Sequence, residues 1–210
     1  MMEVNFKFSK TYRYQVLNED KNAKTVLYVL HGYGQLAKFF IQKFKEVNPT
    51  ILIVAPEGMH RFYRKGNAGR VGASWMTKEA REIDIEDNVL YLNELDRLIS
   101  SSYPIENRIL LGFSQGASTA IRWKQDARVT FNSLIVWASD FPPDIEWNKR
   151  FKNEMYNYFM LGDNDEFFNS KKASEVCEQF LSLGFNIEKY EGVHDIDVKM
   201  LNEILKKINI

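Results

Sequence analysis

The chain has 210 residues, of which 45% are hydrophobic and 27% are charged, and its 28 basic residues balance its 28 acidic residues. This length and composition are typical of one soluble globular domain with a substantial core, and we expect residues 1–210 to form that single domain. The balanced charge provides no overall field that would favour nucleic acid or an anionic membrane as a partner.

The N-terminus and the cysteine content indicate the compartment. Residues 1–10 lack the apolar segment of a signal peptide, and no later apolar run approaches the ~20 residues of a membrane span. The only cysteine, Cys177, cannot form an internal disulfide, and its helical spacing predicts a core position. We therefore expect a cytoplasmic protein without stable membrane insertion, while the oligomeric state stays open.

The first fifty residues predict mainly strands. Residues 4–8 and 12–17 alternate apolar and polar side chains, which predicts an N-terminal hairpin. Continuous apolar runs over 25–30 and 51–55 are typical of strands buried on both faces. A short helix is expected between them, over 37–47.

The middle of the chain contains the longest segment without a period. Residues 59–77 predict an irregular loop, and long loops inside compact domains are often functional. An amphipathic helix is expected over 84–101 because apolar side chains recur there at helical spacing. A short buried strand over 109–111 and a helix over 115–126 follow.

The C-terminal part continues the alternation of strands and helices. Strands are predicted over 133–138, 155–161 and 186–191, and helices near Trp147, over 170–183 and from about Asp195 onward, where acidic side chains suit a helix N-terminus. This alternation predicts an α/β fold with a mostly parallel, doubly wound sheet and helices on both faces. In such sheets, ligands bind beyond the carboxyl ends of the strands.

One pentapeptide lies between a predicted strand and a predicted helix. Gly112-Phe113-Ser114-Gln115-Gly116 fits the G-x-S-x-G pattern of a nucleophile elbow. A serine on such a sharp turn adopts strained backbone geometry, and side chains two residues before and after it would clash. The alternative is an ordinary glycine-flanked turn, so the context of the motif has to decide.

The remaining groups of a serine hydrolase occur in the required order. A serine nucleophile needs a base, and the base needs an orienting acid. His31, Ser114, Asp165 and His194 each follow a separate predicted strand, so we expect them at one edge of the sheet. The order Ser…Asp…His is met by Ser114, then Asp163 or Asp165, then His194. An exposed loop histidine at 194, or a metal site with the neighbouring aspartates, is the competing interpretation.

Four sequence blocks carry a resemblance to a known family. They are Leu30-His31-Gly32-Tyr33-Gly34, Gly112-Phe113-Ser114-Gln115-Gly116, Gly162-Asp163-Asn164-Asp165 and Gly192-Val193-His194. In order and spacing the chain resembles the phospholipase/carboxylesterase family of α/β-hydrolases, which includes acyl-protein thioesterases. The resemblance implies an α/β-hydrolase fold without a large lid domain, and catalysis that needs neither a cofactor nor a metal.

The resemblance also assigns roles. It implies that Ser114 is the nucleophile, that His194 is the base and that Asp165 is the acid, while Asp163 stabilises its turn. Two segments depart from the family pattern. Residues 166–168 read Glu-Phe-Phe where the family has an apolar residue and proline, and residues 70–75 match the family's tryptophan-bearing loop only loosely.

Acyl transfer also requires hydrogen-bond donors for the developing oxyanion. The elbow geometry offers the backbone N–H of Gln115, and the loop after the strand over 25–30 offers that of Tyr33. Gly32 and Gly34 allow this loop to approach closely. A tight turn without catalytic role is the alternative interpretation of the same glycines.

The expected function is hydrolysis of a small carboxylic ester through an acyl-enzyme intermediate. Trp75, Met76 and Phe167 are candidates to line the acyl pocket, or else they only anchor their loops. His60 and nearby arginines could meet an anionic substrate group or form a solvated loop. The alternatives are a thioesterase or lysophospholipase with the same triad, a serine peptidase, and a non-catalytic ligand-binding protein on this fold.

Overall fold

A seven-stranded sheet forms the centre of the computed structural model, which describes residue 2, residues 4–146 and residues 156–208. The strand order is β1-β3-β2-β6-β7-β8-β9. The strands are β1 (Tyr14–Leu17), β2 (Thr25–Leu30), β3 (Ile51–Pro56), β6 (Asn107–Phe113), β7 (Ser133–Trp137), β8 (Asn157–Gly162) and β9 (Asn186–Tyr190). Only β1 runs antiparallel to its neighbour, and the other neighbouring pairs are parallel.

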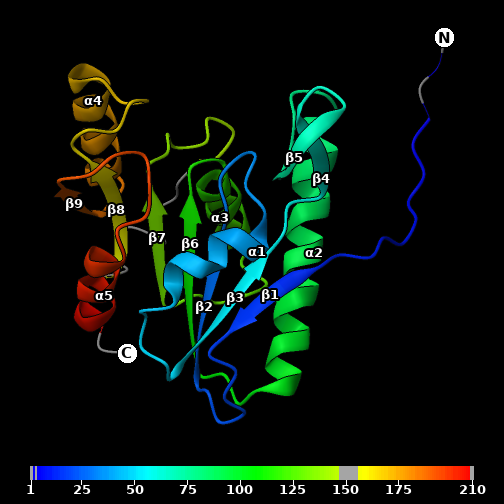
Figure 1. Cartoon of the computed structure of the whole chain (residues 1–210), viewed down its shortest axis with the longest axis horizontal. Helices are drawn as coiled ribbons and strands as arrows, with labels where there is room; N and C mark the ends of the chain where they lie inside the picture. The colour runs from blue at the N-terminus through cyan, green and yellow to red at the C-terminus, as the bar shows by residue number, and fades with distance from the viewer. Residues whose placement is uncertain (1, 3, 147–155, 209–210) are drawn as a thin grey trace.

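Helices cover both faces of this sheet. They are α1 (Ala37–Phe40), α2 (Arg81–Ser102), α3 (Gln115–Asp126), α4 (Ser170–Ser182) and α5 (Val198–Lys207), with a 3-10 turn, η1 (Ile41–Phe44), after α1. In Figure 1, α1 lies in front of the sheet and α3 lies behind it. The mostly parallel sheet and its flanking helices confirm the predicted α/β architecture, and no inserted lid domain is present among the described residues.

The central strands are buried because they are apolar along their whole length. Every residue of β2, β3, β7 and β8 is buried, as expected for strands covered on both faces. The apolar runs in the sequence predict these strands to within a few residues. In the described part of the chain, no helix combines the length and the apolar character needed to cross a membrane.

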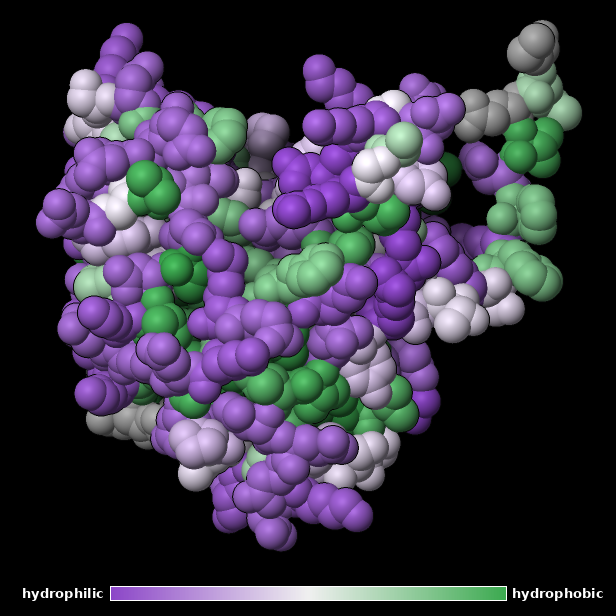
Figure 2. All heavy atoms as spheres, in the orientation of Figure 1, coloured by the Kyte–Doolittle hydropathy of each residue, from purple (hydrophilic) through white to green (hydrophobic). Residues whose placement is uncertain are grey.

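The predicted N-terminal hairpin is wrong. Residues 4–13 form no regular element, and β1 pairs with β3, with Tyr14 opposite Pro56. This N-terminal segment extends away from the body of the molecule (Figure 1), and its apolar side chains lie on the surface in Figure 2. Phe6 and Phe8 are 86% and 87% exposed. A long-range partner at the edge of the main sheet therefore overrides the local alternation.

The segment 59–77, predicted to be irregular, instead forms a two-stranded antiparallel ribbon. Its strands are β4 (His60–Lys65) and β5 (Ala68–Ser74), with Lys65 paired to Ala68 across a two-residue turn. Most of its side chains are exposed, so no apolar face marks the strands in the sequence. The base of the ribbon bridges to Gln35 through Ala73, which places it beside the loop after β2.

Smaller differences concern element ends and one side chain. The helix expected over 37–47 divides into α1 and η1, and α2 begins earlier than predicted. Cys177 lies at the margin of the core and is only partly buried. The helix expected near Trp147 lies outside the described residues.

Candidate active site

Ser114 sits at the junction of β6 and α3 in strained backbone geometry, with φ of 53° and ψ of −121°. The two flanking glycines permit this turn. A Cβ at position 112 would lie 2.6 Å from the Gly116 carbonyl oxygen, and one at position 116 would lie 2.5 Å from the His31 carbonyl oxygen. Real side chains do not tolerate such contacts with backbone, so the steric reason for G-x-S-x-G is confirmed at both positions.

His194 and Asp165 meet directly after the two last strands of the sheet. The His194 Nδ1 atom lies 2.7 Å from the Asp165 Oδ2 atom. The other carboxylate oxygen of Asp165 accepts the backbone N–H of Phe167 at 2.9 Å, and the Asp165 side chain is fully buried. An ionised carboxylate only accepts, so beside such a group Nδ1 carries the shared proton, and in the neutral imidazole Nε2 is then the acceptor.

The His194 ring is also held from the sides. The ring of Phe113 lies 4.8 Å from it and that of Phe167 lies 4.5 Å from it, between centroids. The backbone N–H of His194 donates to the Glu166 carboxylate at 3.4 Å. Glu166 and Phe167, the two residues directly after Asp165, thus both contact His194. They belong to the segment that departs from the pattern of the family that the sequence resembles.

Asp163, the other aspartate of the turn after β8, does not contact His194. Its side chain points to solvent, and its backbone N–H donates to the Tyr190 carbonyl at 2.9 Å. The turn is thus held by the main chain of Asp163 rather than by its carboxylate. Of the two aspartates that the chain order leaves open, Asp165 is the one beside His194.

Ser114 and His194 line the same cavity, which has a volume of about 580 Å³. Ser114 Oγ and the His194 ring are not hydrogen-bonded to each other in the described part of the chain. Contacts of this kind commonly tighten only when substrate binds. Asp165 and His194 are therefore in direct hydrogen-bond contact, whereas His194 and Ser114 face the same cavity.

The loop after β2 leaves one backbone donor free beside this cavity. The N–H of Gly32 donates to the Gln35 side chain at 2.9 Å, and the N–H of Gly34 donates to the Ala73 carbonyl at 2.8 Å. Between them, the N–H of Tyr33 has no acceptor among the described residues, and Tyr33 lines the cavity.

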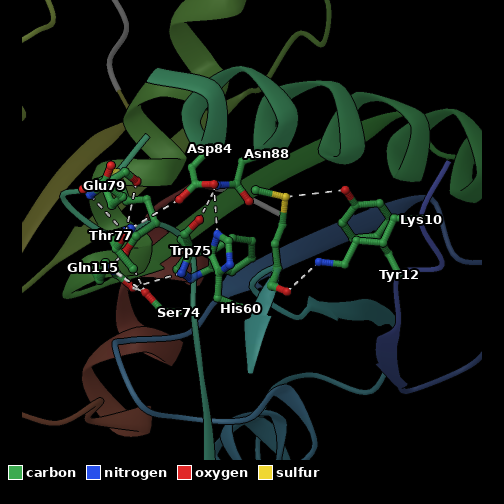
Figure 3. Close-up of polar contacts among 12 residues, drawn as sticks. Lys10, Tyr12, His60, Ser74, Trp75, Thr77, Glu79, Asp84, Asn88 and Gln115 are labelled. Atoms are coloured by element: carbon green, nitrogen blue, oxygen red, sulfur yellow. Dashed lines mark hydrogen bonds and ion pairs between the residues drawn. The ribbon is translucent and has the colours of Figure 1, made fainter. Parts of the chain in front are cut away.

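The Gln115 side chain is clamped by the end of β5, as Figure 3 shows. Its Oε1 atom accepts the Ser74 hydroxyl and the Trp75 backbone N–H, both at 3.1 Å. Its Nε2 atom donates to the Met76 carbonyl at 2.9 Å. Because Gln115 is the first residue of α3, its own backbone N–H has no partner within the helix. The sequence pattern does not predict these contacts, because it does not predict β5.

His31 is fully buried and supports the loop after β2. Its Nδ1 atom donates to the Gly32 carbonyl at 2.8 Å, and its Nε2 atom accepts the Gly58 N–H at 3.0 Å. Burial lowers the pKa of His31 to about 4, so the ring is neutral near pH 7. His31 lies at the sheet edge predicted for it, but it does not line the cavity.

Two of the three predicted pocket residues line the cavity. Met76 and Phe167 do so, whereas Trp75 is fully buried elsewhere. The Trp75 indole donates to the His31 carbonyl at 2.8 Å, and its ring lies 5.0 Å from the His31 ring. The pocket role for Trp75 is therefore wrong, and the alternative interpretation, packing that anchors the loop, is correct.

His60 is turned away from the cavity. Its Nε2 atom lies 2.9 Å from the Asp84 carboxylate on α2 (Figure 3). Sequence reasoning missed three cavity-lining cations, Arg81, Arg122 and Lys172. Arg122 could have been found, since it follows Ser114 by eight residues and thus lies on the same side of α3.

The amino-acid sequence matches the profile of a known protein family. Residues 12–210 match the profile of a family described as Phospholipase/Carboxylesterase. A search of curated protein sequences gives no significant match.

Solved structures share the fold at low sequence identity. Esterase PE8 is 20% identical with a TM-score of 0.69, and the alignment covers 95% of this chain and 100% of that chain. Acyl-protein thioesterase 2 from Zea mays is 16% identical with a TM-score of 0.72, covering 94% and 97%. A carboxylesterase from Mesorhizobium loti is 14% identical with a TM-score of 0.72, covering 93% and 94%. At these identities, the likeness establishes the α/β-hydrolase fold.

Proposed function

Because the chain belongs to the phospholipase/carboxylesterase family, we propose that it is a serine hydrolase that cleaves carboxylic esters through Ser114, His194 and Asp165. The observation that carries the proposal is the 2.7 Å contact between His194 and Asp165 beside the strained Ser114 elbow. Strain of this kind persists only where the surrounding structure imposes it, and it is concentrated at functional sites.

In the first half of the reaction, His194 Nε2 takes the proton of the Ser114 hydroxyl as Ser114 Oγ attacks the ester carbonyl. Asp165 keeps the proton of the histidine on Nδ1 and stabilises the imidazolium that forms. The tetrahedral intermediate then expels the alcohol, which takes the proton from Nε2, and an acyl-Ser114 ester remains. Water, activated by the same nitrogen, attacks this ester and releases the acid.

The free backbone N–H groups of Tyr33 and Gln115 are the proposed donors to the oxyanion. Each such donor contributes about 3–4 kcal/mol to lowering the barrier in hydrolases of this type. Three features support this role: the occupied N–H groups on both sides of Tyr33, the position of Gln115 at the start of α3, and the lining of one cavity by both residues.

Steady-state kinetics on the purified chain test the proposal. We expect the wild-type chain to turn over 4-nitrophenyl acetate and butyrate. Ser114→Ala and His194→Ala should each lower kcat at least about a thousandfold. Ser174→Ala, which changes an exposed serine on α4, is the control and should keep wild-type rates. An acylthiocholine, a lysophosphatidylcholine and a peptide anilide, assayed in parallel, separate the thioesterase, lysophospholipase and peptidase alternatives. Absence of turnover with every substrate would identify a non-catalytic binding protein.

A further inference from the structure

The cavity beside Ser114 is lined by more cationic than anionic side chains. Arg81, Arg122 and Lys172 line it, and Asp140 is the one carboxylate among the described lining residues. Lys172 is already paired with Asp140, at 2.9 Å. The unbalanced positive charge of the cavity therefore comes from the two arginines.

Both arginines are hydrogen-bonded to the same carboxylate, that of Asp144. Asp144 Oδ1 accepts Nη2 of Arg81 at 2.6 Å and Nη2 of Arg122 at 2.7 Å, and Oδ2 accepts Nε of Arg122 at 2.9 Å. Asp144 does not line this cavity and instead faces a separate surface hollow on the other side of Arg122. The hydrogen bond from Arg122 holds the pKa of Asp144 well below its ordinary value, so one negative charge faces two positive ones.

The remaining donors of the two guanidinium groups have no strong acceptor among the residues that the structure describes. The Arg122 side chain is only 4% exposed, and its Nη1 atom contacts the Met76 sulfur at 3.8 Å. A thioether sulfur is a weak acceptor, and a buried charged donor without a good partner is costly. Glu82 lies 3.9 Å from Arg81 but is mostly exposed, so solvent screens that pair. A carboxylate in the cavity would supply the missing acceptor.

The position of Arg122 relative to the nucleophile sets the size of such a ligand. Ser114 directly precedes α3, and Ser118 and Arg122 follow it at four-residue steps; all three line the cavity. Eight residues correspond to about 12 Å along a helix axis. Long side chains on a helix lean back toward its N-terminus, which brings the guanidinium closer to Ser114. An anion a few carbon atoms away from the reacting carbonyl fits this separation.

We propose that the enzyme prefers esters that carry a free carboxylate a few carbon atoms from the scissile bond, and that Arg122 and Arg81 bind this carboxylate. A guanidinium fits a carboxylate better than an ammonium does, because its donors form a planar fork. The inference rests on the proposed esterase function and specifies its substrate class.

Matched substrate pairs measure this preference. On the acyl side, the mono-4-nitrophenyl ester of adipic acid is compared with the 4-nitrophenyl ester of adipamic acid, in which a neutral amide replaces the carboxylate. On the alcohol side, 3-acetoxybenzoate is compared with 3-acetoxybenzamide. We expect kcat/KM to favour the anion about tenfold or more in one of the two pairs, which also identifies the side that occupies the cavity. The preference should fall with added salt.

Variants connect the preference to the arginines. Arg81→Gln and Arg122→Gln should each reduce the ratio of anionic to neutral kcat/KM about tenfold, whereas Asp144→Asn should raise it because it removes the competing carboxylate. Arg128→Gln, which removes an exposed cation outside the cavity, should leave the ratio unchanged. If Arg122→Gln does not fold, Arg81→Gln and Asp144→Asn still give opposite predictions.

The outcomes separate this inference from the esterase proposal. Equal kcat/KM within both pairs, or a preference that is unchanged in Arg81→Gln and Asp144→Asn, would overturn the carboxylate site while 4-nitrophenyl acetate turnover kept the esterase proposal intact. Loss of turnover with the neutral esters as well would overturn the esterase proposal itself.

Discussion

The carboxylate of Asp165 contacts the imidazole of His194 across the gap between two neighbouring strands, with 2.7 Å between Oδ2 and Nδ1. Asp165 follows β8 and His194 follows β9, and these strands pair in parallel. The parallel pairing places both residues at the same edge of the sheet. The backbone N–H of Phe167 then fixes the direction of the carboxylate by binding its other oxygen.

Replacing Asp165 by asparagine tests the functional meaning of this contact. An amide at this position can donate a hydrogen bond to Nδ1 and so favours the wrong tautomer of the histidine. We expect kcat for 4-nitrophenyl acetate to fall by about 10³–10⁴-fold with little change in thermal stability. Asp163→Asn, two residues away and exposed, is the matched control and should keep its activity. Equal activity losses in the two variants would argue against a specific role for Asp165.

Gly116 tests the steric basis of the elbow. A Cβ at this position would meet the backbone at the end of β2, 2.5 Å from the His31 carbonyl oxygen, and this backbone cannot move without opening the sheet. We expect Gly116→Ala to lower the free energy of unfolding by about 3 kcal/mol or more. Urea denaturation measures the loss.

Gly66 provides the control for this substitution. It adopts a positive φ of 56° in the hairpin turn, but a Cβ there would meet nothing within 4 Å. Gly66→Ala should therefore cost only about 1 kcal/mol, the backbone strain alone. A Gly116→Ala variant as stable as Gly66→Ala would contradict the steric account.

The sequence predicts the parts of the fold in which local pattern and tertiary environment agree. The run at 25–30 is apolar throughout because β2 is covered on both faces, and its bounds match the strand. The helix over 115–126 is also predicted with its observed bounds, since the elbow marks its start. Chain order and strand ends predict Ser114 and His194 and leave Asp163 or Asp165 as the acid, because parallel strands bring their carboxyl ends together. The family resemblance selects Asp165.

The ribbon at 60–74 could not be predicted from its apolar pattern, because an exposed two-stranded ribbon has no face to bury. The one local signal is Gly66-Asn67, a pair typical of a two-residue hairpin turn. For a related reason, the sequence does not decide between the pocket role and the packing role of Trp75. Its burial against His31 depends on where the ribbon ends, and the sequence does not reveal that position.

The buried histidine predicts a pH dependence of stability. The folded protein keeps His31 neutral down to about pH 4, whereas the unfolded chain protonates it near pH 6.5. The unfolded state thus binds more protons between these values, so this contribution is fully present above pH 6.5 and is lost as the pH falls toward 4. Its size is about 3 kcal/mol.

Comparison with His31→Gln isolates this contribution from that of the other titrating groups. We expect the difference in free energy of unfolding between wild type and variant to be largest near pH 7 and to shrink by pH 4.5, measured by urea denaturation at each pH. A difference that is independent of pH would show that His31 is protonated in the folded protein as readily as in the unfolded chain.

The clamp on the Gln115 side chain predicts a positioning effect. Gln115→Ala removes the bonds to Ser74, Trp75 and Met76 but keeps the backbone N–H that is proposed to bind the oxyanion. A small displacement of such a donor can reduce the rate about 10²-fold, so we expect lower kcat with little change in KM. Gln179→Ala, on the exposed side of α4, should leave both parameters unchanged. A purely structural clamp would instead lower thermal stability and spare kcat.

Covalent labelling of Ser114 is the most direct measurement of the proposed chemistry. Intact-protein and peptide mass spectrometry after reaction with a fluorophosphonate should reveal one adduct per chain, located on Ser114. The adduct should disappear in Ser114→Ala and form far more slowly in His194→Ala. A correctly folded wild-type chain that stays unlabelled, or that carries its adduct on another residue, would contradict the assignment of Ser114 as an activated nucleophile.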